Sequence, residues 1–286
     1  MNRSFRCWLA LFLFVGSSEG LVSPRVPRSV FVGSRVMLIP PKGVVGSFLH
    51  QSCSFLELSA TTEPFASDGK VTRGDVYEFC DKDLRGAAMK LHKRSKESSR
   101  EDKVDTNVKG ISGCTLQNYR CFLETSLQVY QALEDVTSKD ERYLSLMEGG
   151  HARVKGIKAD LQHFDQIGVT AGPDTGPDEV GQEYAQFLTD LSRSSPPRFL
   201  CHYYNHYFAH TAGGMQIGNS LRSSILQGRQ LEFYKYPGSV RDVMDDLKLR
   251  IDEMYETMSE EEKELAREET GNCFGYGGRV LGSLFR

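Results

Sequence analysis

The stretch FLCHYYNHYFAHTAGGMQIG, residues 199–218, places three histidines four residues apart and follows them with two adjacent glycines. On an α-helix, residues four apart are separated by about 40° around the axis and about 6 Å along it, so His202, His206 and His210 share one face. Gly213 falls on that face, and paired glycines weaken a helix and let another group approach its backbone. The stretch therefore predicts a helix with a bare, weakened segment, which a close helix–helix contact or a kink would also explain.

The histidine stripe is a poor candidate for a metal site. His202 and His210 lie about 12 Å apart along such a helix, whereas zinc ligands must all reach within about 2.0–2.1 Å of one ion. A neighbouring pair could share an ion, but no HExxH or CxxC motif accompanies the stripe. We therefore expect packed or solvated histidines, with a structural zinc site as the minor alternative.

The composition is that of a globular protein. The chain has 286 residues, of which 39% are hydrophobic and 26% charged, enough for one medium domain and an extension. The net charge of −3 argues against nucleic acid as the main partner. The seven cysteines show no metal-binding spacing. Two of them lie within residues 1–65, and the remaining five are expected to be small, reduced, buried residues, which favours a reducing compartment.

The N-terminal part reads as a targeting leader. Residues 1–20 resemble a secretory signal peptide, and their apolar run, residues 7–15, is too short to span a bilayer. Residues 21–65 are basic and hydroxylated, as in a disordered transit-type leader. Together they are similar to the bipartite leader of algae with complex plastids, which predicts the plastid stroma. The alternative is a secreted protein with a disordered pro-segment; either reading leaves residues 66–286 as the functional domain.

The rest of the chain is patterned for helices. Apolar residues follow helical spacing from about residue 72, and no stretch reads convincingly as a strand. Asp75 is a candidate N-cap for the first helix, and Ser259 with Glu262 forms a capping box for the last one. The pattern predicts one all-α domain without internal repeats, whose helices cover about residues 74–96, 115–136, 139–165, 178–192, 199–218, 239–258 and 260 onward.

One further constellation lies in the first expected helix. Arg85, Ala88 and His92 share one face, with the cation and the imidazole about 10.5 Å apart along the axis and a small residue between them. Such a face suits a flat plate with an anionic rim and a metal at its centre. Haem is such a plate, because its iron takes an axial histidine and its propionates pair with basic side chains. Taken alone, the pattern is weak, since a lone helical histidine is more often structural.

Three motifs change that balance. AMKLH at 88–92, FLCHYYNHYFAHTAGG at 199–214 and LEFYKYPG at 231–238 occur in the order and spacing of heme oxygenases, and they resemble the plant and algal plastid type. The resemblance covers about residues 75–280. It implies a single-domain, all-α heme-oxygenase-like bundle that holds haem between a proximal helix and a kinked distal helix.

The resemblance also implies site residues. His92 matches the proximal iron ligand, and Gly213 and Gly214 match the distal glycines whose backbone lies close over the haem. Tyr204 matches an aromatic position near the haem edge. The basic residues that match propionate-binding positions, or neighbour one, are Arg85, Lys248 and Arg250, although a solvated helix face would explain the last two equally well.

Two departures from the family pattern stand out. Animal and bacterial members carry an aspartate where this chain has His210, and that aspartate organises the waters that deliver protons. Plant-type members resemble this chain in having histidine, which can also donate and accept hydrogen bonds. Met215 stands where plant members have an arginine in the motif GGRMIG, which puts a role for that arginine in doubt.

The implied activity is the cleavage of haem to biliverdin IXα, CO and Fe²⁺ with O₂ and electrons, feeding bilin chromophore synthesis. Haem is then both substrate and prosthetic group, and reduced ferredoxin is the expected donor. Because ferredoxins are acidic, the basic stretch KLHKRSK (90–96) is a candidate docking surface. We expect a monomer without a stable membrane span.

Other functions remain open at this stage. A haem carrier or sensor on the same fold would bind haem without turning it over, and some plant relatives of this kind lack the proximal histidine. A thiamine-degrading type of enzyme would need a nucleophilic cysteine in an acidic pocket. A structural helical bundle would bind no haem.

Overall fold

The computed structural model describes residues 77–98, 113–170 and 179–285, and of residues 92–98 it describes the helix backbone. Every regular element within these ranges is helical, which confirms the all-α prediction. The predicted leader and the N-cap Asp75 lie outside the described residues. The elements are η2 (Glu78–Leu84), α2 (Arg85–Ser98), α3 (Leu116–Lys139), η4 (Glu141–Met147), α4 (Val154–Gln166), α5 (Glu179–Ser194), α6 (Pro196–Ala209), η5 (His210–Gly214), α7 (Met215–Ser224), η6 (Glu232–Tyr234), α8 (Val240–Glu256), α9 (Glu260–Gly282) and η7 (Ser283–Phe285).

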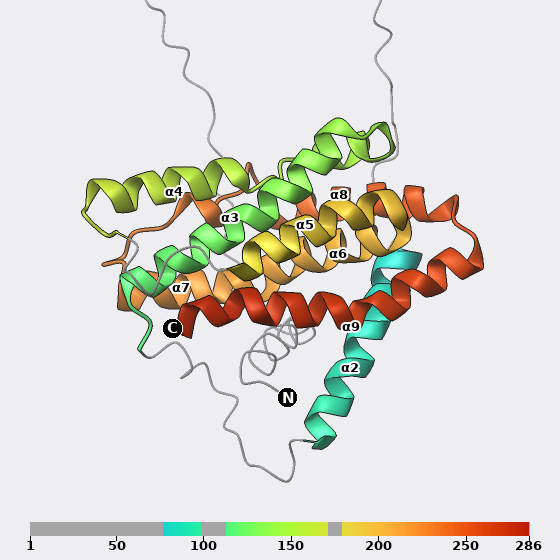
Figure 1. Ribbon diagram of the computed structural model, residues 1–286, viewed down its shortest axis with the longest axis horizontal. Coiled ribbons are helices and arrows are strands. Elements are labelled where there is room, and N and C mark those ends of the chain that lie inside the picture. Colours follow the sequence, from blue (N-terminus) through green and yellow to red (C-terminus); the bar gives the residue numbers. More distant parts are fainter. Residues whose placement is uncertain (1–76, 99–112, 171–178, 286) are drawn as a thin grey trace, which may run out of the picture. The chain divides into compact units, whose positions relative to one another are not determined.

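Helix α6 lies in the middle of the packing. It contacts α5 on one side and α9 on the other, and α3 packs along α5 (Figure 1). Burial of aromatic rings dominates this core, and such rings contribute large apolar areas. Buried examples from five different helices are Tyr119, Phe164, Tyr184, Phe199, Tyr203, Tyr207 and Phe274. None of the helices within the described ranges is long and apolar enough to cross a membrane.

The helix starts follow local capping chemistry. The Thr115 hydroxyl accepts a hydrogen bond from the backbone N–H of Asn118, whose side chain accepts one from the backbone of Thr115. Ser259 and Glu262 make the same reciprocal pair at the start of α9, which confirms the predicted capping box. Each pair satisfies donors that a helix start leaves without intrahelical partners.

The prediction of one continuous helix over 139–165 is wrong. The chain forms the short helix η4, breaks, and starts again as α4. Gly149 and Gly150 have φ values of +97° and +81°, a region that disfavours side chains and ends a helix. The buried Arg153 guanidinium then holds the turn by donating to the carbonyls of Gly150, His151, Phe233 and Lys235.

The distal stretch is interrupted by a π-helical turn at the place where the resemblance implied a kink. Helix α6 begins with Pro196 at its first position and runs into the π-helical turn η5, which contains both adjacent glycines. A wider π turn inside an α-helix changes its direction and often marks a functional site. Helix α7 then continues, with Gly218 lying close to the ring of Tyr234.

This close approach makes Gly218 intolerant of a side chain. A Cβ there would come 2.6–2.8 Å from three Tyr234 ring atoms, and that ring is fixed by a 2.9 Å hydrogen bond to Tyr119. We expect Gly218→Ala to lower the free energy of unfolding by about 1–3 kcal/mol, measured by denaturant unfolding. Gly271→Ala in α9 is the control, because nothing lies within 4 Å of its Cβ position. An unchanged unfolding midpoint in Gly218→Ala would contradict the packing described.

Candidate functional site

The proximal side of the candidate site is built from η2 and α2, which follow each other without a break. Arg85 is the first residue of α2, and Ala88, one turn on, is fully buried. His92 occupies the next turn of the same helix, so the predicted spacing of cation, small residue and imidazole is helical as expected. The side chain of His92 lies outside the described residues, and its role as iron ligand stays a prediction.

The start of this proximal segment is held by a distant carboxylate. Asp252 of α8 accepts hydrogen bonds from the backbone N–H groups of Phe79 and Cys80, at 3.2 and 3.1 Å. These donors have no intrahelical partner, so the contact acts as a cap supplied from elsewhere in the fold. Burial raises the pKa of Asp252, although the two backbone donors work against that shift.

Lys248 stands where the proximal and distal elements meet. Its ammonium lies 3.2 Å from a carboxylate oxygen of Asp81 in η2 and 5.7 Å from the centroid of the Phe208 ring in α6. The Tyr77 ring is 5.3 Å away on the proximal side. Only 18% of the Lys248 side chain is exposed, so the cation is directed inward rather than into bulk solvent.

Tyr204 lies near Lys248, where η2, α2, α6 and α8 meet. Its ring stacks on Phe208 at a centroid distance of 4.3 Å and is almost fully buried. Burial raises the pKa of Tyr204 well above its usual value, Asp81 raises it further, and Arg85 lowers it. Arg85, Tyr204 and Lys248 are therefore grouped around one corner between η2, α2, α6 and α8.

On the distal side, His210 is fixed by its surroundings. Its Nε2 lies 3.2 Å from the backbone carbonyl of Phe233, and its ring stacks against Tyr234 at 5.2 Å. Burial and, to a smaller extent, the nearby Arg153 guanidinium lower the pKa of His210 to about 3, so the ring is neutral. A carbonyl accepts only, hence Nε2 carries the proton and Nδ1 offers a lone pair.

Gly214 lies beside the Nδ1 edge of that ring. A Cβ built on Gly214 would come 3.0 Å from His210 Nδ1, which is tighter than ordinary contacts. Gly213 is buried in the same π-helical turn. Glycine at position 214 therefore leaves space beside Nδ1 of the imidazole. A larger residue at this position would fill that space.

The three histidines of the stripe have separate partners. His202 contacts the Tyr184 hydroxyl at 2.8 Å through Nδ1 and the Glu269 carboxylate at 3.0 Å through Nε2. His206 lies against the Tyr130 ring at 4.6 Å, and burial lowers its pKa to about 3. Within the described residues no group of three or more metal-ligating side chains converges. The stripe is thus part of the packing of α6 and of the start of η5.

Arg250 is not brought to the corner. Its guanidinium pairs with Asp246 at 2.9 Å, with Glu148 at 2.8 Å and with the carbonyl of Ser145 at 3.1 Å. These partners hold it against η4, away from Asp81 and Phe208. Lys248 thus contacts groups of η2 and α6, whereas Arg250 contacts groups of η4, its own helix and Glu148, and the propionate-binding role of each stays a prediction.

Sequence reasoning missed several residues of the corner. Asp81 is an acid in a segment expected to supply cations, and only the fold shows that it pairs with Lys248. Phe208 lies one helical turn after Tyr204, so its spacing could have identified it. The carbonyl of Phe233, which sets the tautomer of His210, carries no signal in the sequence.

Comparison with known structures supports the fold. Heme oxygenase 2 from Chlamydomonas reinhardtii, solved without heme, matches with a TM-score of 0.54 at 22% identity, covering 71% of this chain and 95% of that one. Heme oxygenase-1 from Synechocystis sp. PCC 6803, solved in complex with heme, also matches with a TM-score of 0.54, at 18% identity, covering 73% and 92%.

Sequence comparison is more specific. The chain is 30% identical over 269 residues to the chloroplastic heme oxygenase 1 of Arabidopsis thaliana, covering 91% of this chain and 93% of that protein. It is 36% identical over 169 residues to a probable inactive heme oxygenase 2, chloroplastic, of Oryza sativa subsp. japonica, covering 58% and 50%. The family model described as Heme oxygenase matches residues 81–282. With this match spanning most of the described domain, the chain belongs to the heme oxygenase family.

Proposed function

We propose that the chain binds haem between α2 and the kinked segment η5–α7 and cleaves it, with O₂ and reducing equivalents, to biliverdin IXα, CO and Fe²⁺. The observation that carries this proposal is the position of Lys248, which reaches both the proximal segment, at Asp81, and the distal helix, at Phe208. A cation at this junction suits the propionate edge of a plate lying between the two elements.

The residues of the corner suit the chemistry of haem. Arg85 and Lys248 supply two cations for an anionic edge, and the Tyr204–Phe208 stack supplies an apolar wall. The bare edge at Gly214 leaves room for close backbone approach. Bound haem supplies the iron at which oxygen is activated. His92 of α2 would hold that iron.

The protein contributes orientation and proton control. Arg85 and Lys248 would fix the propionates and so determine which edge of the ring faces the kink. His210 would accept a hydrogen bond from a distal water at Nδ1, while its Nε2–H stays on the carbonyl of Phe233. A neutral imidazole fixed in this tautomer offers an acceptor, as the aspartate of other family members does.

Ferredoxin is the proposed electron donor, and the plastid stroma the proposed location. The support is the chloroplastic assignment of the relatives in Arabidopsis and rice, together with the leader-like composition of residues 1–65. In the docking stretch 90–96, Lys90 is exposed. We propose a monomeric enzyme whose product feeds bilin synthesis in an alga with a complex plastid.

A spectroscopic experiment tests the activity. Hemin is added to residues 66–286, reduced ferredoxin is supplied in air, and the visible spectrum is followed. We expect a sharp haem band that decays while a broad red biliverdin band rises. A haem band that persists would contradict turnover and identify a protein that binds haem without cleaving it; one rice relative is named a probable inactive heme oxygenase. No haem band at all would overturn the proposal.

A further inference from the structure

Three positions along one side of α8 hold the proximal segment. Lys248 pairs with Asp81, Asp252 caps the backbone of Phe79 and Cys80, and the Tyr255 hydroxyl donates to the carboxylate of Asp83. The positions 248, 252 and 255 are three or four residues apart, so they lie on one face of the helix. The helix that supplies the propionate-binding cation therefore also fixes the base of the proximal helix.

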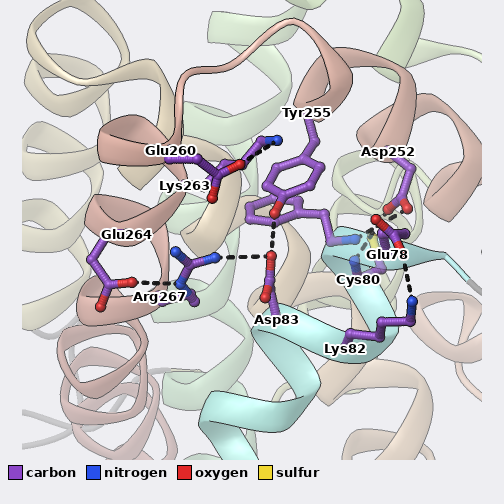
Figure 2. A network of polar contacts seen from close by, with 11 residues as sticks. Glu78, Cys80, Lys82, Asp83, Asp252, Tyr255, Glu260, Lys263, Glu264 and Arg267 are labelled. Carbon is purple, nitrogen blue, oxygen red and sulfur yellow. Dashed lines mark hydrogen bonds and ion pairs between the residues drawn. The ribbon is translucent and has the colours of Figure 1, made fainter.

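Asp83 contacts two different helices in this interface. Its carboxylate accepts from Tyr255 and also from the Arg267 guanidinium of α9, at 3.1 Å (Figure 2). The Tyr255 ring stacks on Phe79 at 4.2 Å with an interplanar angle of 16°. Burial and the neighbouring Asp83 raise the pKa of Tyr255, so the phenol stays protonated and continues to donate. Asp83 thus joins η2 to two other helices at one point.

A small change of helix direction at Asp83 would be amplified further along α2. Asp83 precedes Arg85 by two residues and His92 by nine, in one continuous helical segment. Nine residues of helix span about 13.5 Å, so a tilt of about 5° at Asp83 displaces the position of residue 92 by about 1 Å. A displacement of about 1 Å is enough to change reactivity by a factor of about 100 when a reacting group is misplaced.

We propose that Asp83, held by Tyr255 and Arg267, is a positioning residue that sets the angle of α2 and thereby determines which edge of the haem faces the distal kink. This inference rests on the proposed function. Asp83 does not touch the haem; it acts through Arg85 and His92. Loss of the contact lets α2 tilt, which loosens haem binding and mixes the positions at which the ring is opened.

The variants are chosen to separate positioning from folding. Asp83→Asn removes the charge, and Tyr255→Phe removes one hydroxyl while keeping the ring that stacks on Phe79. Asp252 is avoided, because its loss would leave two backbone donors at the helix start without partners. Lys82→Gln is the matched control: it is adjacent to Asp83, its side chain is 60% exposed and it pairs with the exposed Glu78.

The experiment measures three quantities on the full-length protein: the hemin dissociation constant, the distribution of biliverdin isomers by chromatography, and the thermal unfolding midpoint without hemin. We expect Asp83→Asn and Tyr255→Phe to weaken hemin binding about tenfold and to yield isomers that the wild-type protein does not form. Lys82→Gln should match the wild-type protein in all three. If Asp83→Asn does not fold, the hemin affinity and isomer distribution of Tyr255→Phe test the inference instead.

A lowered unfolding midpoint with an unchanged isomer distribution and hemin affinity would overturn the inference and leave Asp83 a structural residue. Mixed isomers in Lys82→Gln would also overturn it, because any change in this segment would then have the same effect. Failure of the proposed function is distinguishable, since the wild-type protein would then produce no biliverdin at all.

Discussion

Replacing His92 with alanine is expected to abolish native haem ligation and turnover. The iron would lose its axial nitrogen, and the remaining contacts at Arg85, Tyr204 and Lys248 would hold the ring by its edge alone. Losing a group that only supports a metal ligand costs roughly 10–100-fold in affinity or activity. Loss of the ligand itself should exceed that range. The measurements are the absorption spectrum of the hemin complex and the rate of biliverdin formation.

Two controls sharpen this test. His163→Ala removes another helical histidine, in the last turn of α4, and should leave ligation and turnover unchanged. Added imidazole should enter the space left by His92→Ala and restore the spectrum of a histidine-ligated haem, because it supplies the missing nitrogen without the tether. Normal turnover by His92→Ala to the same isomer would contradict the assignment of His92.

Local chemistry made much of the fold predictable. The capping pairs at Thr115 and Ser259 lie within four residues of sequence, and the helical apolar spacing that follows them is a local signal. The weakened helix segment was predicted from two adjacent glycines, of which Gly213 lies on the face of the histidine stripe, and the family resemblance implied a kink there. These features depend on neighbours along the chain, so a single sequence contains them.

Long-range contacts explain what sequence reasoning missed. Asp252 caps a helix start 172 and 173 residues away, and no local pattern predicts such a partner. Arg250 and Lys248 are two residues apart on α8 and look equivalent in sequence, yet Glu148 holds the first while Asp81 pairs with the second. The direction of a charged side chain is decided by its partners across the fold.

His210 depends on both a local sequence signal and a long-range contact. Its place in the kink follows from the sequence, but its chemistry follows from the carbonyl of Phe233, which is 23 residues away. A histidine free to choose its tautomer could donate or accept at either nitrogen. With Nε2 donating to the carbonyl, the acceptor is confined to Nδ1, beside Gly214. Two substitutions of His210 can therefore separate the role of the acceptor Nδ1 from that of the donor Nε2.

We expect His210→Gln to lower turnover by a factor of about 100 or more, the usual scale of lost proton-transfer assistance, while hemin affinity changes little. Glutamine reaches the carbonyl of Phe233 with its amide but has no acceptor at the position of Nδ1. His210→Asn places an oxygen at that position and should stay within about tenfold of the wild-type rate. Its cost falls on stability instead, by about 1–3 kcal/mol, because the buried carbonyl loses its donor.

The measurements are single-turnover rates with reduced ferredoxin, hemin titrations and the ¹⁵N shifts of the His210 ring, which should show a protonated Nε2 and an unprotonated Nδ1. Because burial holds the pKa of His210 at about 3, its imidazole should stay neutral from pH 5 to 8. Its ¹⁵N shifts should therefore not titrate in that range. Equal turnover by the glutamine and wild-type proteins would show that Nδ1 is not used, and the acceptor would then have to come from the backbone of the kink.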